Sequence, residues 1–421
     1  MESEGPGRGA GGGDRLEGFL ERIDNGWVFG WAWDPRVPDA PVEVEVSVAG
    51  APAVRAVANL YRPDLESAGK GNGRHAFEAR LPDGARASST SIEVRFAGTG
   101  RQLHGSPSAV ASADPGNGAA PTGATYRSRF GGLWTDLSNA REVLEGKAAL
   151  GWITAEEKAL LAHWIDEGYV LLPGAVPAES IDRLDADVES VWSGRTSEKC
   201  LVEFLEDGAV LHPASARFKE ERAKLLDLHV HFESARELVF HPRVVRILSL
   251  ILERPMLAFQ SLYFRWGSRQ DVHQDTAYVK VSSPLEFVAS WIALEDVREG
   301  SGELEYYPRS HTLDDFLFDG RHKWMPAKSK EEGAYLASLH SRSAERGFER
   351  RKFRPRKGDV FLWSADLAHG GSQRVEPGLT RKSLVTHYCP VDCDPVYADG
   401  RLRPERRPHG AVAWYAAHPR G

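Results

Sequence analysis

Two side chains of the segment 271–276, Asp-Val-His-Gln-Asp-Thr, could bind one metal ion together. His273 and Asp275 lie two residues apart, so on an extended segment both point to the same face. His369, much later in the chain, would complete a set of two imidazoles and one carboxylate. Such a set suits Fe(II) held on one face, with its other coordination positions open to oxygen and an organic acid.

A His-x-Asp pair alone does not identify a metal site. With 15 His and 60 acidic residues in 421, a chance His-x-Asp or His-x-Glu is expected. The chain contains a second such sequence, His231-Phe232-Glu233. The surrounding sequence must therefore decide which pair binds metal.

Four blocks around these residues resemble, in content and order, the core of the phytanoyl-CoA dioxygenase family. They are residues 258–276, 290–297, 302–311 and 358–388. The resemblance covers roughly residues 150 to 400, where a helix, a glycine and a strand also open the family's domain. It implies an Fe(II)- and 2-oxoglutarate-dependent dioxygenase that uses O2, with iron bound by His273, Asp275 and His369.

The resemblance also assigns residues to the cosubstrate. Arg381 is expected to bind the distal carboxylate of 2-oxoglutarate, because a guanidinium forms two parallel hydrogen bonds to a carboxylate and lysine cannot. The adjacent Lys382 points to the other face of a strand. The positions that lie near the cosubstrate in the family are Gln260, Gln274 and Trp291.

The expected reaction is hydroxylation of a small molecule. Relatives that halogenate need a vacated ligand position, whereas Asp275 is present here. Where the family commonly has Pro-Gly-Ser-His, this chain has Arg309 in place of glycine, which puts the usual loop geometry in doubt. Arg309 would place a cation near an anionic substrate, and Tyr263 is a second expected substrate contact.

The elements that must position these residues are mostly strands. Predicted strands at 257–265, 278–281, 286–294, 303–307, 358–363 and 382–389 fit a double-stranded β-helix, a jelly-roll barrel whose mouth can hold a metal. Helices precede them: a capping box at Thr154 to Glu157 opens the first, and a further helix is expected over 178–192. Residues 312–350 are interpreted as a charged insertion, either a lid or a solvated loop.

The N-terminal quarter predicts a small all-β, sandwich-like module. Residues 42–48 alternate apolar and polar, 54–60 would return as a hairpin partner, and 91–96 form a last strand. The aromatic segment 26–34 supplies either an aromatic platform for sugars or one face of the core. The core interpretation is favoured for Trp27, Trp31 and Trp33, because small β modules need large apolar side chains.

The expected domain layout has four parts. A disordered tail spans 1–13, the accessory module spans 14–104, an Ala/Pro/Gly linker spans 105–125, and the dioxygenase domain spans 126–421. The accessory module resembles β modules on bacterial glycan-handling enzymes, which hints at a glycan- or carrier-linked substrate. Dimerisation or domain packing would explain the module equally well.

Composition narrows the class of protein. A net charge of -7 and a pI near 6.1 argue against a general nucleic-acid binder. Residues 1–13 lack the apolar stretch of a signal peptide, and no apolar run reaches the ~20 residues that span a bilayer. The three cysteines fit reduced structural thiols, so a cytoplasmic protein without nucleic-acid or membrane partners is expected. The oligomeric state stays open.

Two other functions remain compatible with the sequence. One is a non-catalytic ligand-binding protein on the same fold, although such a protein would not need all three ligands and Arg381. The other is a different metal-dependent enzyme, such as an isomerase or a cupin-like hydrolase. Formation of succinate coupled to substrate would distinguish a dioxygenase from such an isomerase or hydrolase.

Overall fold

The computed structural model describes residues 16–417 except 25–26, 49–53, 63–64, 67, 81–90, 104–105, 107, 110–123, 197, 199, 205–209, 327–328, 396–404 and 411. The expected tail at 1–13 and most of the expected linker lie outside the described residues. The backbone divides into two compact units, 1–119 and 120–421.

The N-terminal unit is built from two four-stranded sheets. One sheet has the order β1-β2-β6-β5 and the other β4-β3-β7-β8. Their bounds are β1 Glu17–Asp24, β2 Trp27–Trp33, β3 Val42–Val48, β4 Val54–Ala58, β5 Leu60–Tyr61, β6 Arg74–Arg80, β7 Ser91–Phe96 and β8 Ser108–Ala109. Buried residues of both sheets form one core, as a sandwich requires. The three predicted strands and the β3–β4 hairpin are confirmed.

The expectation that the tryptophans of β2 fill this core is wrong for Trp31 and Trp33, and the side chain of Trp27 lies outside the described residues. Val28 and Ala32 are fully buried in the core, whereas Trp31 and Trp33 lie half-buried on the opposite face of the strand. The inner face needs small residues here, because a Cβ at Gly30 would meet the Phe77 ring at 2.8 Å. The Lys70 ammonium lies 5.6 Å and 4.6 Å from the two indole rings, on the face that a sugar platform would present.

Two sheets form the C-terminal unit, a double-stranded β-helix. The larger sheet has the order β11-β10-β12-β13-β19-β14-β17-β9, with β21 and β20 added beside β13, and the smaller has the order β16-β15-β18. The strands are β9 Tyr169–Leu172, β10 Leu201–Phe204, β11 Val210–Pro213, β12 Ala223–Leu226, β13 Met256–Phe264, β14 Val288–Ala293, β15 Leu304–Tyr306, β16 Arg351–Phe353, β17 Val360–Ser364, β18 His369–Gly371, β19 Ser383–Pro390, β20 Glu405–Pro408 and β21 Ala413–Ala417.

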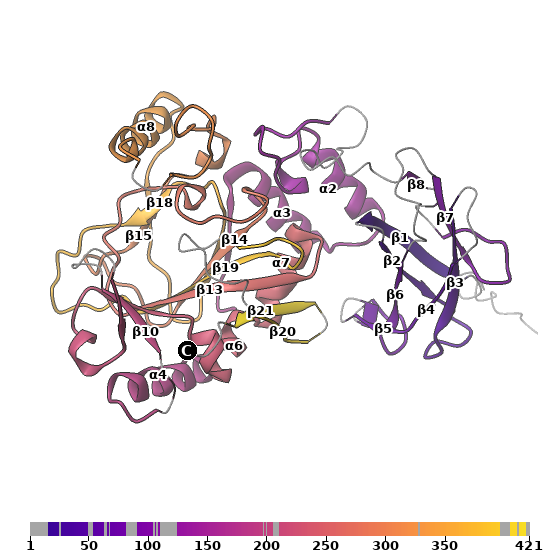
Figure 1. The fold of residues 1–421 in the computed structure, drawn as a ribbon, viewed down its shortest axis with the longest axis horizontal. Coiled ribbons are helices and arrows are strands. Elements are labelled where there is room, and N and C mark those ends of the chain that lie inside the picture. The colour runs from indigo at the N-terminus through magenta and orange to yellow at the C-terminus, as the bar shows by residue number, and fades with distance from the viewer. Residues whose placement is uncertain are drawn as a thin grey trace, which may run out of the picture. The chain divides into compact units, whose positions relative to one another are not determined.

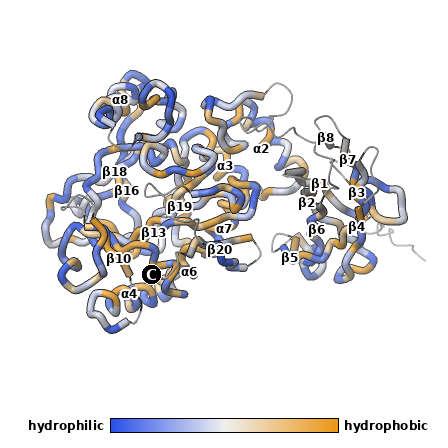
Figure 2. The backbone as a smooth tube through the Cα atoms, in the orientation of Figure 1, coloured by the Kyte–Doolittle hydropathy of each residue, from blue (hydrophilic) through white to orange (hydrophobic). Residues whose placement is uncertain are grey.

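Helices cover one face of the larger sheet and add a separate layer beyond the smaller one. They are α2 Ala140–Ala149, α3 Ala155–Glu167, α4 Ala178–Trp192, α5 Leu228–His231, α6 Glu233–Val239, α7 Pro242–Leu252 and α8 Glu332–Glu345. Figure 1 shows α8 (orange) near β15 and β18, across the unit from α4 and α6. The hydrophobic stretches run along β13 and around α7, where the largest core cluster lies (Figure 2).

Local sequence signals set these helix ends correctly. Thr154 and Glu157 form the predicted capping box at the start of α3, and the predicted helix 178–192 is observed as α4.

The predicted strand 278–281 is wrong. A 3-10 turn at Asp275–Ala277 bends the chain directly before it, and Val281 alone makes a β-bridge, to Pro395.

The predicted insertion at 312–350 contains α8, which packs inward rather than forming only a solvated loop. Its apolar side chains join a buried cluster with Val272, Ala277 and Ala368, each next or close to an expected metal ligand. The insertion therefore packs against the segments that carry the expected metal ligands.

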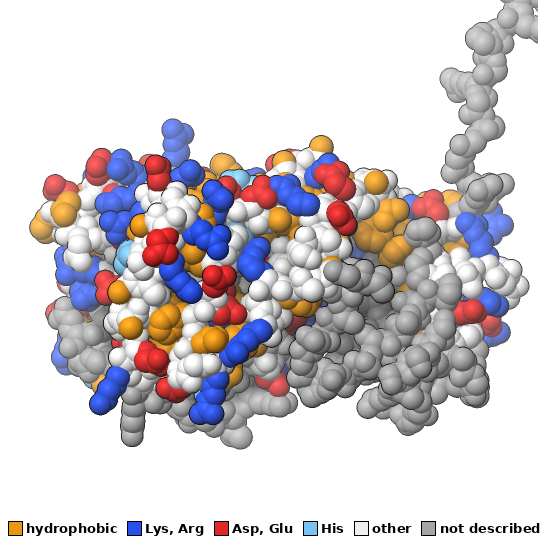
Figure 3. All heavy atoms as spheres, turned by 90° about the horizontal axis from the view of Figure 1, so that it is seen from above, with side chains coloured by type: hydrophobic (Ala, Val, Ile, Leu, Met, Phe, Trp, Pro, Cys, Tyr) orange, Lys and Arg blue, Asp and Glu red, His pale blue; other side chains and the backbone are white. Residues whose placement is uncertain are grey.

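On the face of the protein seen in Figure 3, acidic and basic side chains are interspersed.

Candidate metal centre

The two expected histidine ligands form a directly bonded antiparallel pair. His273 N donates to His369 O and His369 N donates to His273 O, both at 2.8 Å. Opposed residues of such a pair project their side chains to the same side of the sheet. The ring centroids are accordingly 4.8 Å apart. One bridge thus brings together residues that are nearly a hundred positions apart in sequence.

Glycine after His369 allows this close approach. A Cβ at Gly370 would lie 2.7 Å from Gln270 O and 3.0 Å from the Val272 Cα, so any larger residue would push the segment before His273 away. The His-Gly-Gly sequence of β18 is therefore a packing requirement of the site.

A carboxylate completes the group. The ligand atoms of His273, Asp275 and His369 all lie within 4.8 Å of one another, and the three side chains are buried. The Asp275 Oδ1 atom is 3.7 Å from the Nε2 atom of each histidine. Among the described residues this is the one cluster of three or more such side chains that could hold a metal ion. The alternative pair is not such a site, since His231 bonds to Glu198.

Backbone carbonyls orient both imidazoles for metal binding. The Nδ1 atom of His273 lies 2.7 Å from Asp271 O, and that of His369 lies 2.9 Å from Leu367 O. A carbonyl only accepts, so each Nδ1 carries the proton and each Nε2 keeps a free lone pair toward Asp275. Burial lowers the pKa of His369 to about 4, so its imidazole is neutral near pH 7, as a ligand must be. These residues therefore fit a bound Fe(II).

Two residues that the sequence analysis did not select lie at the other carboxylate oxygen, and one of them, Trp363, forms a hydrogen bond to it. Trp363 Nε1 donates to Asp275 Oδ2 at 2.9 Å, and His387 Nε2 lies 3.5 Å from the same oxygen. Oδ1 is thereby left to face the two ligand histidines. An indole N–H only donates, so the bond from Trp363 stabilises the ionised form of the Asp275 carboxylate.

Arg381 is a buried cation without a counter-ion. Its side chain is 2% exposed, and its Nε atom has no hydrogen-bond partner. The guanidinium lies 5.4 Å from the Trp291 ring and 5.8 Å from the Phe264 ring, and within the described parts of the chain it forms no ion pair. Burial lowers its pKa to about 10, so it stays charged at neutral pH. The carboxylates of Glu295 and Glu303 attract it without forming an ion pair, so an anion bound beside the guanidinium would compensate its charge.

The other expected cosubstrate residues divide into two groups. Trp291 and Gln260 lie on the inner face of the larger sheet: Trp291 beside Arg381 with its Nε1 unpaired, and Gln260 opposite His387 in the β13–β19 register. Gln274 points away from the ligands, because its Nε2 donates to Asp366 O at 2.7 Å.

The structure does not bring the two expected substrate contacts to the metal ligands. Tyr263 is buried in the core on the helical face of β13, the side away from the ligands. Arg309 is exposed, and its guanidinium lies 5.0 Å from the Phe348 ring. Its φ of 71° is the left-handed conformation that glycine adopts easily, so the turn is formed despite the substitution.

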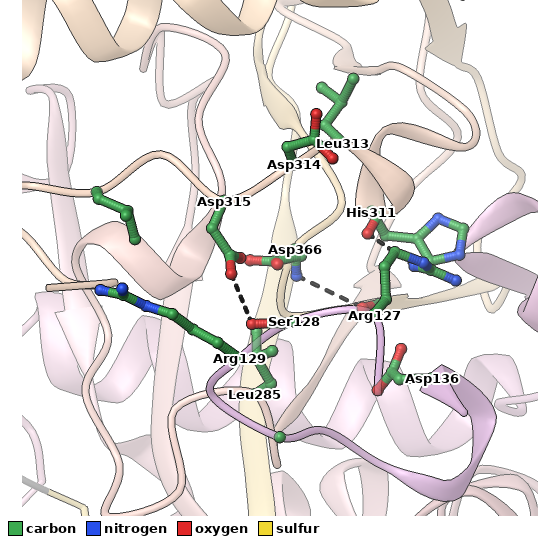
Figure 4. A pocket seen from close by; sticks show the side chains of 13 residues that line it. Arg127, Ser128, Arg129, Asp136, Leu285, His311, Leu313, Asp314, Asp315 and Asp366 are labelled. Carbon is green, nitrogen blue, oxygen red and sulfur yellow. Dashed lines mark hydrogen bonds between the residues drawn. The ribbon is translucent and has the colours of Figure 1, made fainter. Parts of the chain in front are cut away.

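A buried ionic network lies behind the metal ligands. Lys323 Nζ bridges Asp315 and Asp366 at 2.7 and 2.8 Å, and Thr276 donates to Asp366 Oδ1 at 2.6 Å. Figure 4 shows Asp315 and Asp366 side by side, with Ser128 bonded to Asp315, along a cavity of about 280 Å³. None of the three ligands lines that cavity. The network ties the turn after Asp275 to the segment before His369.

Replacing Lys323 with methionine should strongly destabilise the protein. The buried Asp366 and the half-buried Asp315 would lose their shared cation, and breaking a buried ion pair in this way costs about 3–5 kcal/mol in free energy of unfolding. Urea denaturation of the metal-free protein would measure it. Lys357→Met is the matched control: its ion pair with Asp182 is exposed, so a loss below about 1 kcal/mol is expected. Equal losses in both variants would contradict the prediction.

A double-stranded β-helix that carries a His-x-Asp…His group and a buried arginine defines the class of Fe(II)- and 2-oxoglutarate-dependent oxygenases. The model of the phytanoyl-CoA dioxygenase (PhyH) family matches residues 164–382, slightly more than half of the chain. The chain belongs to the phytanoyl-CoA dioxygenase family. It is accordingly a dioxygenase that uses Fe(II), 2-oxoglutarate and O2.

Individual relatives are distant. A phytanoyl-CoA dioxygenase domain-containing protein 1 homolog from Dictyostelium discoideum is 23% identical over 214 residues, which cover 48% of this chain and 70% of that protein. The epimerase SnoN from nogalamycin biosynthesis is 19% identical, with a TM-score of 0.44 over 62% of this chain and 98% of its own. EctD from S. alaskensis, with 2-oxoglutarate and 5-hydroxyectoine, is 16% identical, with a TM-score of 0.44 over 63% and 88%.

No helix among the described residues is both long enough and apolar enough to cross a membrane. The three cysteines, Cys200, Cys389 and Cys393, are buried and free.

Proposed function

We propose that this chain hydroxylates a C–H bond of a small-molecule substrate and converts 2-oxoglutarate to succinate and CO2. His273, Asp275 and His369 would hold the iron, and Arg381 would bind the distal carboxylate of 2-oxoglutarate. The observation that carries the proposal is the pairing of a preformed ligand group with a buried guanidinium that has no ion-pair partner among the described residues and lies beside Trp291, in the same core cluster as Trp363. A purely structural metal site would not require that cation.

The chain's own residues prepare the site before any cofactor binds. The two carbonyl-held imidazoles and the Trp363-held carboxylate need little reorganisation to receive an ion, which favours tight binding. Iron bound with 2-oxoglutarate supplies the oxidising chemistry; the protein supplies orientation and a water-poor interior. Arg381 and Trp291 line that interior from the larger sheet.

Isotope incorporation tests the reaction type. The iron-loaded protein would be given 2-oxoglutarate under ¹⁸O₂, and small molecules would be scored for stimulated release of succinate. With a stimulating substrate, hydroxylation predicts one ¹⁸O atom in succinate and one in the product. A product without ¹⁸O would assign the chain to a ring-forming, desaturating or epimerising reaction instead.

The same experiment addresses the non-catalytic alternative. A ligand-binding protein on this fold could still bind iron and 2-oxoglutarate. It would release no succinate, either with a substrate or without one. Measurable uncoupled turnover of wild-type protein, lost in His369→Ala, would exclude that alternative.

The domain layout is proposed along with the function. Residues 126–421 would carry the whole reaction, and the module at 14–104 would serve it as an accessory domain. A fragment starting at Thr125 should retain iron binding and uncoupled succinate formation. If a folded fragment loses both iron binding and succinate formation, the module must contribute to the catalytic unit.

A further inference from the structure

The peptide unit between the two neighbouring ligands is held by a single side chain. Gln274, which separates His273 from Asp275, donates from its backbone N to the Tyr335 hydroxyl at 2.8 Å. The same hydroxyl donates to Gln274 O at 3.3 Å. Gln274 is 4% exposed and Tyr335 is 1% exposed, so no solvent is at hand to replace either bond. Among the described residues the phenol is the partner of the Gln274 N–H, and it shares the Gln274 carbonyl with the Ala277 N–H, which donates at 3.1 Å.

The Tyr335 ring is itself fixed. It lies in α8 and makes aromatic contacts with Phe316 and Phe318, at centroid distances of 5.3 and 5.2 Å. The surrounding cluster includes Val272, which precedes His273, and Ala368, which precedes His369. Because side chains alternate along an extended segment, these two point away from the side on which the histidines would bind the metal. Movement of the hydroxyl would thus require repacking of the whole cluster.

A second bond holds Gln274 from another direction. Its side-chain Nε2 donates to Asp366 O, three residues before His369. The Tyr335 hydroxyl and the Asp366 carbonyl together restrict rotation of the peptide that carries His273 and Asp275. Because both ligands are covalently attached to Gln274, a rotation there would displace an imidazole and a carboxylate at once.

We propose that Tyr335 is a positioning residue, which sets the metal affinity of the site from the insertion helix α8 without touching the ion. This inference rests on the proposed metal-binding role of the three ligands. It gives the insertion a function in the site: it holds the His-x-Asp turn in its binding geometry. The phenol ring fills the space, and the hydroxyl fixes the turn.

The test compares two phenylalanine variants of the full chain. In Tyr335→Phe the ring remains, but the Gln274 N–H becomes buried and unpaired, and its C=O keeps only the bond from Ala277 N. The unpaired N–H favours rotation of the turn toward new partners. Tyr307→Phe is the matched control, because the Tyr307 hydroxyl bonds to His340 of the same helix at 3.0 Å without contacting the turn. Mn(II) binding would be measured by the loss of the free-ion EPR signal.

A weakening of Mn(II) affinity of about 10- to 100-fold is expected for Tyr335→Phe, the range typical for residues that orient ligands. Tyr307→Phe should stay within about threefold of wild type. Thermal unfolding of the metal-free proteins gives the second readout. A merely structural role would lower the melting temperature and leave the Mn(II) dissociation constant of the folded protein unchanged.

Each outcome decides a separate claim. Wild-type affinity in Tyr335→Phe would overturn the positioning role, and so would an equal loss in Tyr307→Phe, because then any loosening of α8 would suffice. A wild-type protein that binds no Mn(II) at all would instead refute the metal assignment on which the inference rests.

Discussion

Replacing Asp275 with alanine is expected to abolish tight Fe(II) binding. The carboxylate is the group's one anion, and Trp363 donates to its second oxygen, so its loss removes a ligand and leaves a buried indole N–H unpaired. Loss of an orienting partner alone typically weakens metal affinity 10- to 100-fold, so loss of the ligand itself should exceed about 100-fold. Anaerobic titration with Fe(II) measures the effect directly.

Asp271→Ala is the matched control for this change. It removes the same charge four residues earlier, where the side chain is exposed. Its backbone carbonyl would still accept the His273 Nδ1 proton, because that bond does not involve the side chain. Affinity within about threefold of wild type is expected. A comparable loss in both variants would mean that net charge, and not coordination, governs binding.

Local patterns predicted the site's components, and long-range packing supplied what they missed. The His-x-Asp spacing, together with the family resemblance of the surrounding blocks, selected the ligand group that the structure brings together. Tyr335 could not be found this way, because nothing near it in sequence shows that its hydroxyl reaches Gln274, 61 residues away. Such contacts follow from the fold of the insertion, which carries no simple periodicity.

One missed residue did have a sequence signal. The alternation that separates Lys382 from Arg381 also puts His387 on the same face of the strand as Arg381, six residues along. Alternation was misleading at β2 in the N-terminal unit, where Trp31 and Trp33 were expected inside. The inner face there is the one that carries Val28 and Ala32, because the Phe77 ring of the neighbouring strand covers Gly30 and leaves room only for small side chains.

Replacing Arg381 with alanine is expected to weaken 2-oxoglutarate binding by about 100-fold, since removing one partner of a buried charge pair costs roughly 2–5 kcal/mol. Arg381→Lys should also bind weakly, because an ammonium cannot form two parallel bonds to a carboxylate. Isothermal titration of the Mn(II)-loaded protein with 2-oxoglutarate would measure both. Lys382→Ala is the control: its ammonium pairs with Asp185 on the helical side, so near-wild-type affinity is expected.

Arg381→Ala should lower the affinity for 2-oxoglutarate without lowering the stability of the protein. In the cofactor-free protein the guanidinium is buried without a counter-ion, and burial already lowers its pKa to about 10, so the folded state is penalised for holding it. Removing it should leave the free energy of unfolding unchanged or higher, while cosubstrate affinity falls. A variant that loses both stability and affinity would show that Arg381 serves the fold. Loss of affinity alone would identify a cation retained for its ligand.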